Sequence, residues 1–370
     1  MLITSAADEV AWNEYIANQD GGMDALTTSL NWQWPVRLRG LVNLMSHGKD
    51  TPWYGAARSA LEVELERDDT RGASRAVLGQ GLGRLFNVDP EWLTPRVPGL
   101  LGGDGGLSVQ QQIALTTAMA VHFYHSAFYE LLTAPMIAAI DSKEAVTAGW
   151  DTHIDPLQRI GEWVIDAIIR GHKTIDDSVA RKFFSVAPAT VRGQAIGHIA
   201  WGFMHAEVVD DEIRDRFAGL WDQRVAHVRE HPEDQAELNG FFWFVKSKKF
   251  AVGWWLPRLK EAAALGPNLA TERYMIGKEL ASSADVDPRG AFDALKLLVE
   301  GRDEAGMAMH DLTRNAVPMV IAKGIASGDD ALKEDALDFV NQLGEKGNLS
   351  LEAEVNRVLD GTITQSDVGD

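Results

Sequence analysis

Two short phrases that begin helices occur more than once in this chain. Trp92-Leu93-Thr94-Pro95-Arg96-Val97 is matched by Trp254-Trp255-Leu256-Pro257-Arg258-Leu259, with Trp, Pro, Arg and an aliphatic residue at the same offsets. An Asp-Pro pair that opens an amphipathic stretch occurs at residues 89–90, 155–156 and 287–288, so the gaps are 66 and 132 residues. Repeated helix starts in a chain almost without strand signals are typical of a stacked helical solenoid.

Amphipathic helical periodicity runs along nearly the whole chain. Apolar residues at spacings of three and four predict helices over residues 189–205, 210–231, 329–343 and 350–359, and a further helix from Asp155-Pro156 to Gly171-His172. Short segments rich in Gly, Pro and Asp separate these helices. We count about eighteen helices in nine pairs, which gives roughly 40 residues for each pair, the repeat length expected of HEAT-like repeats. We therefore predict an all-α fold, a HEAT-like α-solenoid in the form of a right-handed superhelix of helical hairpins.

We expect residues 1–360 to form one continuous helical-repeat array, followed by a flexible acidic tail at residues 361–370. Two glycine-rich or polar stretches, residues 99–106 and 141–155, are the candidate bends or sub-boundaries. The first predicted helices carry too many aromatic residues for the polar outer face of a terminal repeat. For this reason we expect the chain to be the C-terminal piece of a longer protein.

Charge and composition narrow the classes of partner. The chain of 370 residues has a net charge of −19 and no basic stripe, which disfavours sequence-independent binding of nucleic acid and docking on anionic membranes. It has no cysteine, which excludes disulfides and thiolate zinc sites and fits a soluble, cytoplasmic protein. The least charged stretch, residues 107–140, contains three consecutive Gln and a Pro, so it predicts a pair of buried helices instead of a membrane span.

The densest aromatic segment, residues 241–258, is interleaved with cations. Such a segment can anchor a protein partner, or stack bases as in HEAT-like DNA glycosylases. A third interpretation is an aromatic core between two helices, with the lysines on a solvated turn. Acidic residues just upstream argue against nucleic acid. The candidate partner-binding residues are Trp243, Lys246, Lys248, Lys249, Phe250, Trp254, Trp255 and Arg258.

Only one pair of residues suggests a metal site. His122 and His125 are three residues apart, so on a helix they would share a face and could both bind a metal ion. No third ligand shares that face, because Glu130 is five residues beyond His125. Two histidines satisfied by hydrogen bonds are the plainer interpretation. A metal-dependent helical hydrolase remains the alternative that rests on this pair.

The other motifs fit a packed helical protein better than an enzyme. The phrase Gly79-Gln80-Gly81-Leu82-Gly83 resembles part of a dinucleotide fingerprint, but it follows helical residues, so we expect its glycines to allow close helix contact. His198 and His205 lie two turns apart on a predicted packed helix. His310-Asp311 resembles the centre of an HD phosphohydrolase motif without assignable further ligands. The acidic run at residues 207–212 should cap the helix that follows it.

The segment from Gly83 to Leu265 resembles the helical C-terminal region of large bacterial proteins that carry an N-terminal sirtuin-like or NTPase module. The likeness rests on residues 84–93, on Phe241-Phe242-Trp243-Phe244-Val245, and on Lys249-Phe250 leading into residues 254–259. Several such proteins are thought to act in defence against phage. The resemblance implies a sensing or scaffolding module, and it transfers no catalytic residue.

Together these features predict a non-enzymatic scaffold or recognition module that binds a protein partner and needs no cofactor. The resemblance implies that it is the sensing C-terminal part of a bacterial defence protein. A HEAT-like nucleic-acid-binding or glycosylase-type repair protein is one alternative, and the metal-dependent hydrolase is the other.

Overall fold

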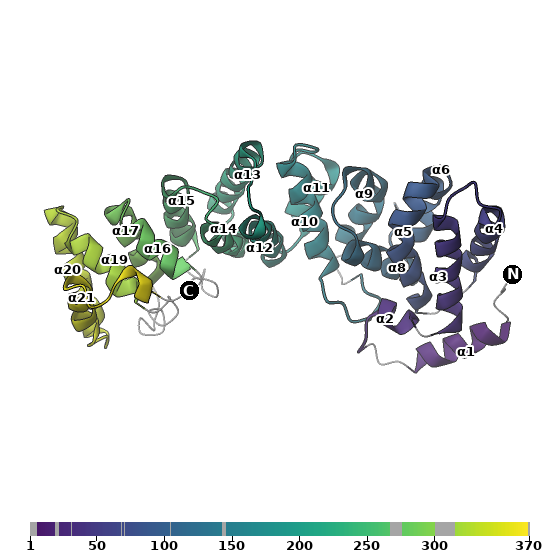
Figure 1. Ribbon diagram of the computed structural model, residues 1–370, viewed down its shortest axis with the longest axis horizontal. Coiled ribbons are helices and arrows are strands. Elements are labelled where there is room, and N and C mark those ends of the chain that lie inside the picture. Colours follow the sequence, from purple (N-terminus) through teal and green to yellow (C-terminus); the bar gives the residue numbers. More distant parts are fainter. Residues whose placement is uncertain are drawn as a thin grey trace. The chain divides into compact units, whose positions relative to one another are not determined.

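The structure is a computed structural model that describes residues 6–18, 22–30, 32–67, 69, 71–103, 105–142, 146–266, 276–299 and 315–368. These residues form helices and connecting turns without a strand, as the sequence predicts, and their one β-bridge joins Gly103 to Gly106. The chain divides into two compact units, Met1–Ala187 and Pro188–Asp370. Figure 1 labels the helices of both units.

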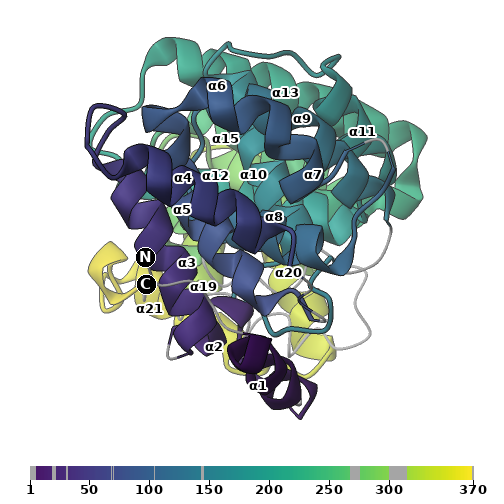
Figure 2. The ribbon, with the colours of Figure 1, turned by 90° about the vertical axis from the view of Figure 1, so that its right-hand side faces the viewer.

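The first unit consists of helices joined by short turns. Its elements are α1 (Ala6–Ala17), α2 (Ala25–Ser29), α3 (Gln33–Ser46), α4 (Tyr54–Leu65), η1 (Ala73–Arg75), α5 (Ala76–Val88), α6 (Pro90–Leu93), η2 (Thr94–Arg96), α7 (Val97–Leu101), α8 (Val109–Val121), α9 (Ser126–Asp141), α10 (Pro156–Ile169) and α11 (Ser178–Val186). Helices α3, α5 and α8 lie side by side in that order, and α9 packs on α11 (Figure 2). Neighbours in space are therefore often alternate helices in the chain.

The second unit follows the same pattern. Its elements are α12 (Ala189–His205), α13 (Asp211–Glu230), η3 (Pro232–Gly240), α14 (Phe241–Ser247), α15 (Val252–Leu265), α16 (Gly277–Ser283), α17 (Pro288–Val299), α19 (Ala316–Ile325), α20 (Asp330–Glu345), α21 (Leu351–Leu359) and η5 (Gln365–Asp367). Helix α12 packs on η3 and α14, and α15, α17, α19 and α21 form a second row of neighbours.

Helix boundaries agree closely with the sequence patterns. The helix predicted at residues 189–205 is α12, and those predicted at 210–231, 329–343 and 350–359 are α13, α20 and α21 with shifts of one or two residues. Residues 107–140 form the expected helix pair, α8 and α9. In the part of the chain that is described, no helix has the length and apolar character needed to cross a membrane.

Each Asp-Pro pair begins a helix in the same way. The Asp89 carboxylate accepts from the Trp92 amide at 3.2 Å, Asp155 from the Leu157 amide at 2.8 Å, and Asp287 from the Gly290 amide at 2.8 Å. Proline occupies the first turn, where its missing N–H leaves no bond unmade. The repeated phrase is therefore a repeated cap.

The second repeated phrase also has a common structure. The guanidinium of Arg96 lies 4.9 Å from the ring centre of Trp92 and donates to the Trp92 carbonyl at 2.8 Å; Arg258 lies 4.5 Å from Trp254 and donates to its carbonyl at 3.2 Å. Each arginine also pairs with a carboxylate of another helix, Glu62 of α4 or Asp222 of α13. The phrase thus fixes a Trp–Arg stack that ties two helices together.

Glycines bring the central helices of the first unit into backbone contact. A methyl group added to Gly79 of α5 would overlap the carbonyl oxygen of Ala114 in α8, and one added to Gly81 would lie 2.5 Å from Val42 of α3. The glycine-rich phrase lies inside α5, not between a strand and a helix. The interpretation as a close helix contact is therefore confirmed, and a dinucleotide fingerprint is excluded.

The unit boundary falls after Ala187, whereas the sequence suggested joints at 99–106 or 141–155; both of those stretches lie inside the first unit. Part of the expected flexible tail makes specific contacts. Ile363 and Val368 are buried, and the Gln365 side chain donates to Ser282 at 3.0 Å and accepts from Lys323 at 2.9 Å. These contacts argue against a free tail at residues 361–368.

We expect Gly79→Ala to destabilise the protein by about 1–3 kcal/mol, because the added methyl group has no room between α5 and α8. Gly40→Ala is the control, since Gly40 is exposed on α3 with nothing within 4 Å of the added carbon. That variant should be neutral or more stable by up to about 1 kcal/mol. Urea unfolding followed by circular dichroism measures both, and equal effects would contradict the close contact.

Candidate functional site

The eight residues predicted to bind a partner lie on α14, on the turn after it and on α15. Phe250 and Trp255 are buried, so they contribute to the core and cannot contact a partner directly. The others are partly exposed: Trp243, Lys246, Lys249, Trp254 and Arg258 are half-buried and Lys248 is exposed. The predicted site is therefore split between the core and the surface.

The buried aromatic rings form one stack in the second unit. Phe217 of α13 lies against Phe244 of α14 with ring centres 3.7 Å apart, and Phe250 lies 4.2 Å from Trp254. Phe203 of α12 joins the same stack at 5.8 Å from Phe244. Aromatic burial contributes much of the hydrophobic stabilisation of a unit of this size. For these rings, the sequence interpretation as an aromatic core is the correct one.

The three lysines of the segment lie in different surroundings. Lys249 donates to the Glu207 carbonyl at 3.0 Å, which ties it to the end of α12. Lys248 lies 3.5 Å from the Glu279 carboxylate. No carboxylate within the described ranges pairs with Lys246. Lys246 is thus the cation of this segment that is free to meet an acidic group from outside.

An exposed aromatic row on α12 was not singled out from the sequence as a binding surface. Trp201 is 45% exposed, and its ring contacts those of His198 and His205 at centroid distances of 6.0 and 4.3 Å. The three residues follow one face of α12 at spacings of three and four. The sequence predicts His198 and His205 to lie on a packed helix, whereas both side chains are exposed. Their spacing with Trp201, opposite the buried residues of α12, was the available signal.

The exposed row lies next to the predicted segment. Helix α12 packs against η3 and α14, and Gly193 and Gly240 allow the two backbones to touch: a methyl group on Gly240 would lie 2.5 Å from the Gly193 carbonyl. Trp243 lies against Gly197, and Phe244 meets Phe203, so the two segments run in parallel. Through Gly197, Trp243 lies beside the turn of α12 that precedes Trp201, and Lys246 follows Trp243 by three residues on α14. We call Trp201, His198, His205, Trp243 and Lys246 the α12–α14 surface.

A buried ionic network joins α12, α13 and η3. Glu237 of η3 is fully buried and accepts two bonds from Arg224 of α13, at 2.5 and 2.9 Å. Arg192 of α12 lies 2.9 Å from Glu237 and 2.7 Å from Asp234, which also accepts from His227 at 2.8 Å. Three elements are therefore joined by charges that water does not screen.

The ionic network changes the pKa of the Asp234 carboxyl group. Burial raises the pKa of this carboxyl, but the hydrogen bonds from His227 and Arg192 and the arginine charge outweigh burial, so the pKa lies below its usual value of 3.8. The same balance lowers the pKa of Asp89, bonded to Lys49 and Tyr54, and of Asp177, bonded to Tyr129.

The histidine pair does not form the helix face that the sequence suggested. His122 ends α8 and His125 caps α9, so the two lie in the connection between helices. The His122 ring stacks on Phe128 and its Nε2 lies 3.0 Å from the Gly79 carbonyl; burial lowers its pKa, partly offset by that bond. The prediction of a shared helix face is wrong because the His125 side chain accepts the Ala127 amide and starts a new helix. Across the described ranges, no three His, Asp or Glu residues gather as metal ligands.

The acidic run at residues 207–212 leads into α13, as the sequence predicts. Asp210 stands at the N-cap of α13, but its carboxylate accepts no capping hydrogen bond from a backbone amide. Asp211 and Glu212 lie in the first turn, where negative charge is favourable. His310-Asp311 lies outside the residues that the structure describes.

Comparison with known proteins adds no relative: no family model, curated protein or solved structure matches the chain. The interpretation of the site therefore rests on its own geometry.

We expect Glu237→Gln to destabilise the second unit by about 3–5 kcal/mol, because it leaves Arg192 and Arg224 buried without their shared counter-charge. Glu233→Gln is the control: Glu233 is exposed in the same η3 helix and should change stability by less than about 0.5 kcal/mol. Urea unfolding at pH 7 measures both. Equal stability of the two variants would show that the buried network does not stabilise the unit.

We expect stability to fall on acidification through the lowered pKa values of Asp234, Asp89 and Asp177. Each group has a lower pKa folded than unfolded, so its contribution is complete above pH 3.8 and is lost as the pH falls through the folded value. Urea midpoints from pH 6 to pH 2.5 measure this loss. Asp234→Asn should make the loss smaller; an unchanged profile would contradict the assignment of Asp234.

Proposed function

We propose that this protein is a non-enzymatic recognition module, a HEAT-like helical-repeat scaffold that binds a protein partner through the α12–α14 surface. Packing between alternate helices supports the solenoid part of the proposal, because stacked hairpins place every second helix in contact. A sensing role in a bacterial defence protein, which the resemblance implies, belongs to the same proposal. So does a cytoplasmic location.

The exposed Trp201 carries the proposal. Tryptophan is enriched among the residues that dominate the energy of protein interfaces, and a large aromatic ring left in solvent has a cost that a partner removes. The indole lies against the His198 and His205 rings, and α12 packs closely on η3. Close packing of this kind lowers the entropy that side chains and helix lose when a partner binds.

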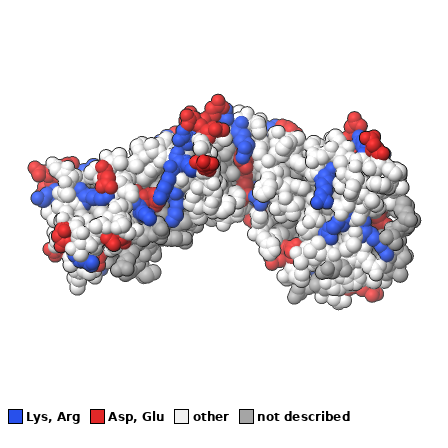
Figure 3. Space-filling model, in the orientation of Figure 1, with Lys and Arg blue, Asp and Glu red and all other residues white. Residues whose placement is uncertain are grey.

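The charges beside Trp201 indicate the chemistry of the partner. Lys246 is half-buried on α14, and Trp243, on the same helix, adds a second half-buried ring. Figure 3 shows Lys and Arg gathered over α13 and α15 beside Asp and Glu. We infer that the partner is a protein segment with an apolar side chain flanked by carboxylates. Such a segment would place its apolar group on Trp201 and its acidic groups near Lys246.

Affinity capture from a nuclease-treated lysate of the source cell, with quantitative mass spectrometry, tests this function. Trp201→Ala should reduce recovery of a stoichiometric protein at least tenfold, as expected for an interface residue worth about 2 kcal/mol. Trp53→Ala is the matched control, because Trp53 is 43% exposed at the start of α4 in the other unit.

Three results would contradict the proposal: a protein that Trp201→Ala and Trp53→Ala retain equally, a bound component that nuclease removes, or no stoichiometric protein. The variant should unfold at the wild-type urea concentration, since Trp201 is exposed. Replacing Trp255 would not give a clean test, because that side chain is buried and its loss would act through folding.

A further inference from the structure

A pocket in the first unit has the features of a small-molecule site. It lies between α2, α8 and residues 150–154, and its volume is about 310 Å³. Apolar side chains form its walls, among them Ile113, Val121, Trp150 and Ile154. Pockets that bind small molecules have volumes from about 300 Å³ and are mostly apolar with a few placed polar groups.

Hydrogen bonds fix the segment that closes the pocket. Thr116 of α8 donates to the Val146 carbonyl at 2.7 Å, and the Trp150 indole donates to the Arg71 carbonyl at 3.0 Å. The Arg71 guanidinium covers the Trp150 ring at 4.5 Å. Helix α8 is itself held by its contact with Gly79, whose added methyl group would lie 2.9 Å from the Thr117 β-carbon. The pocket is therefore formed before any ligand binds.

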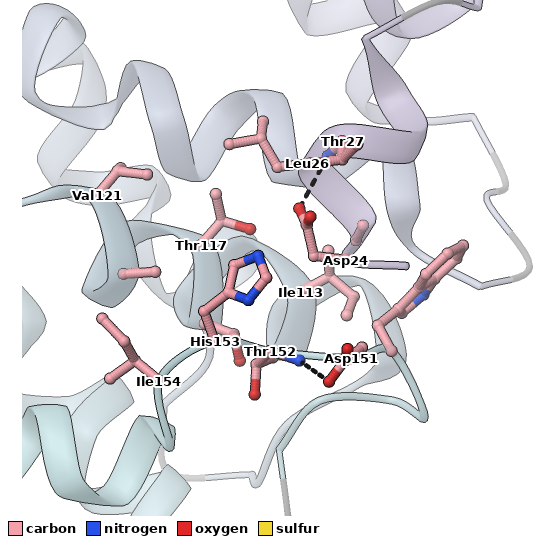
Figure 4. Close-up of a pocket in the computed structure, with 14 residues that line it drawn as sticks. Asp24, Leu26, Thr27, Ile113, Thr117, Val121, Asp151, Thr152, His153 and Ile154 are labelled. Atoms are coloured by element: carbon pink, nitrogen blue, oxygen red, sulfur yellow. Dashed lines mark hydrogen bonds between the residues drawn. The ribbon is translucent and has the colours of Figure 1, made fainter. Parts of the chain in front are cut away.

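Thr117 has an unused hydroxyl in this pocket. Its side chain is only 7% exposed and lines the pocket, and no hydrogen bond within the described part of the chain uses its hydroxyl. The hydroxyl reaches the surface of the pocket, so a ligand there can make a hydrogen bond with it in place of water. Figure 4 shows Thr117, Asp24 and His153 directed toward the same space.

The charges of the pocket select the kind of ligand. Asp24 accepts the Thr27 amide at 2.8 Å through one carboxylate oxygen, and Asp151 accepts the Thr152 amide at 2.8 Å through one oxygen. Each carboxylate keeps a second oxygen for another donor. No Lys or Arg lines the pocket among the described residues. A cation is therefore favoured, and a phosphate or carboxylate is repelled.

We propose that this pocket binds a small aliphatic amine. The Asp24 carboxylate and the Thr117 hydroxyl accept hydrogen bonds from the ammonium group, and Ile113, Val121 and Ile154 contact the alkyl chain. A charged hydrogen bond to Asp24 supplies specificity, and burial of the chain supplies affinity. This site lies in the other unit from the α12–α14 surface and does not depend on the proposed protein partner.

Ligand-observed NMR titration of the full chain with n-hexylamine, hexanoate and 1-hexanol tests the proposal. We expect n-hexylamine to bind with a Kd of about 1 mM or tighter, as a ligand of this size allows, and at least ten times more tightly than hexanol or hexanoate. Equal binding of the three compounds, or no binding of the amine at 10 times that concentration, would overturn the proposal.

Two variants locate the site without disturbing the fold. Asp24→Asn should weaken amine binding at least tenfold, and it keeps a good N-cap for α2. Thr117→Val keeps the shape of the side chain and should weaken binding about threefold to tenfold through loss of the hydroxyl. Asp210→Asn, at the N-cap of α13 outside the pocket, is the matched control and should bind like the wild type.

Thermal unfolding of each variant without ligand separates loss of binding from loss of folding. If amine binding survives Thr117→Val and Asp24→Asn unchanged, the amine occupies another place and the proposal is wrong. Should Asp24→Asn unfold, Thr117→Val alone decides between the two outcomes.

Discussion

Backbone contact between helices at glycine is the constraint on which both units depend. In the first unit Gly79 and Gly81 let α5 lie directly against α8 and α3. In the second, Gly193 and Gly240 let α12 touch η3. Interiors are close-packed, so a single added methyl group at such a contact must displace a whole helix.

The close contacts position chemistry as well as apolar residues. Thr117 faces its pocket from the part of α8 that meets Gly79, and Trp243 lies against Gly197 next to the turn that carries Trp201. In the second unit Glu237 joins Arg192 and Arg224, and the packing that excludes water from these side chains also strengthens the ionic network.

Helix positions could be predicted from the sequence because they depend on local signals. Asp-Pro caps and three-four periodicity placed the starts of α10 and α17 and both ends of α12, and the glycine phrase of α5 was correctly interpreted. The candidate site was harder to predict, because the exposure of a side chain depends on which face of its helix packs against a neighbouring helix. Phe250 and Trp255 turn inward while Trp201 turns outward, and nothing in their types distinguishes them. The predicted shared helix face of His122 and His125 was wrong for a related reason, because α8 ends at His122 and the His125 side chain caps the start of α9.

Hydrogen–deuterium exchange of the two variants Gly79→Ala and Gly240→Ala tests the central claim most directly. Exchange reports local opening of each helix. If the glycine contacts hold the units together, Gly79→Ala should speed exchange in α5 and α8 but not in α12 or η3, and Gly240→Ala should do the reverse. Unchanged exchange at the altered contacts would contradict the account.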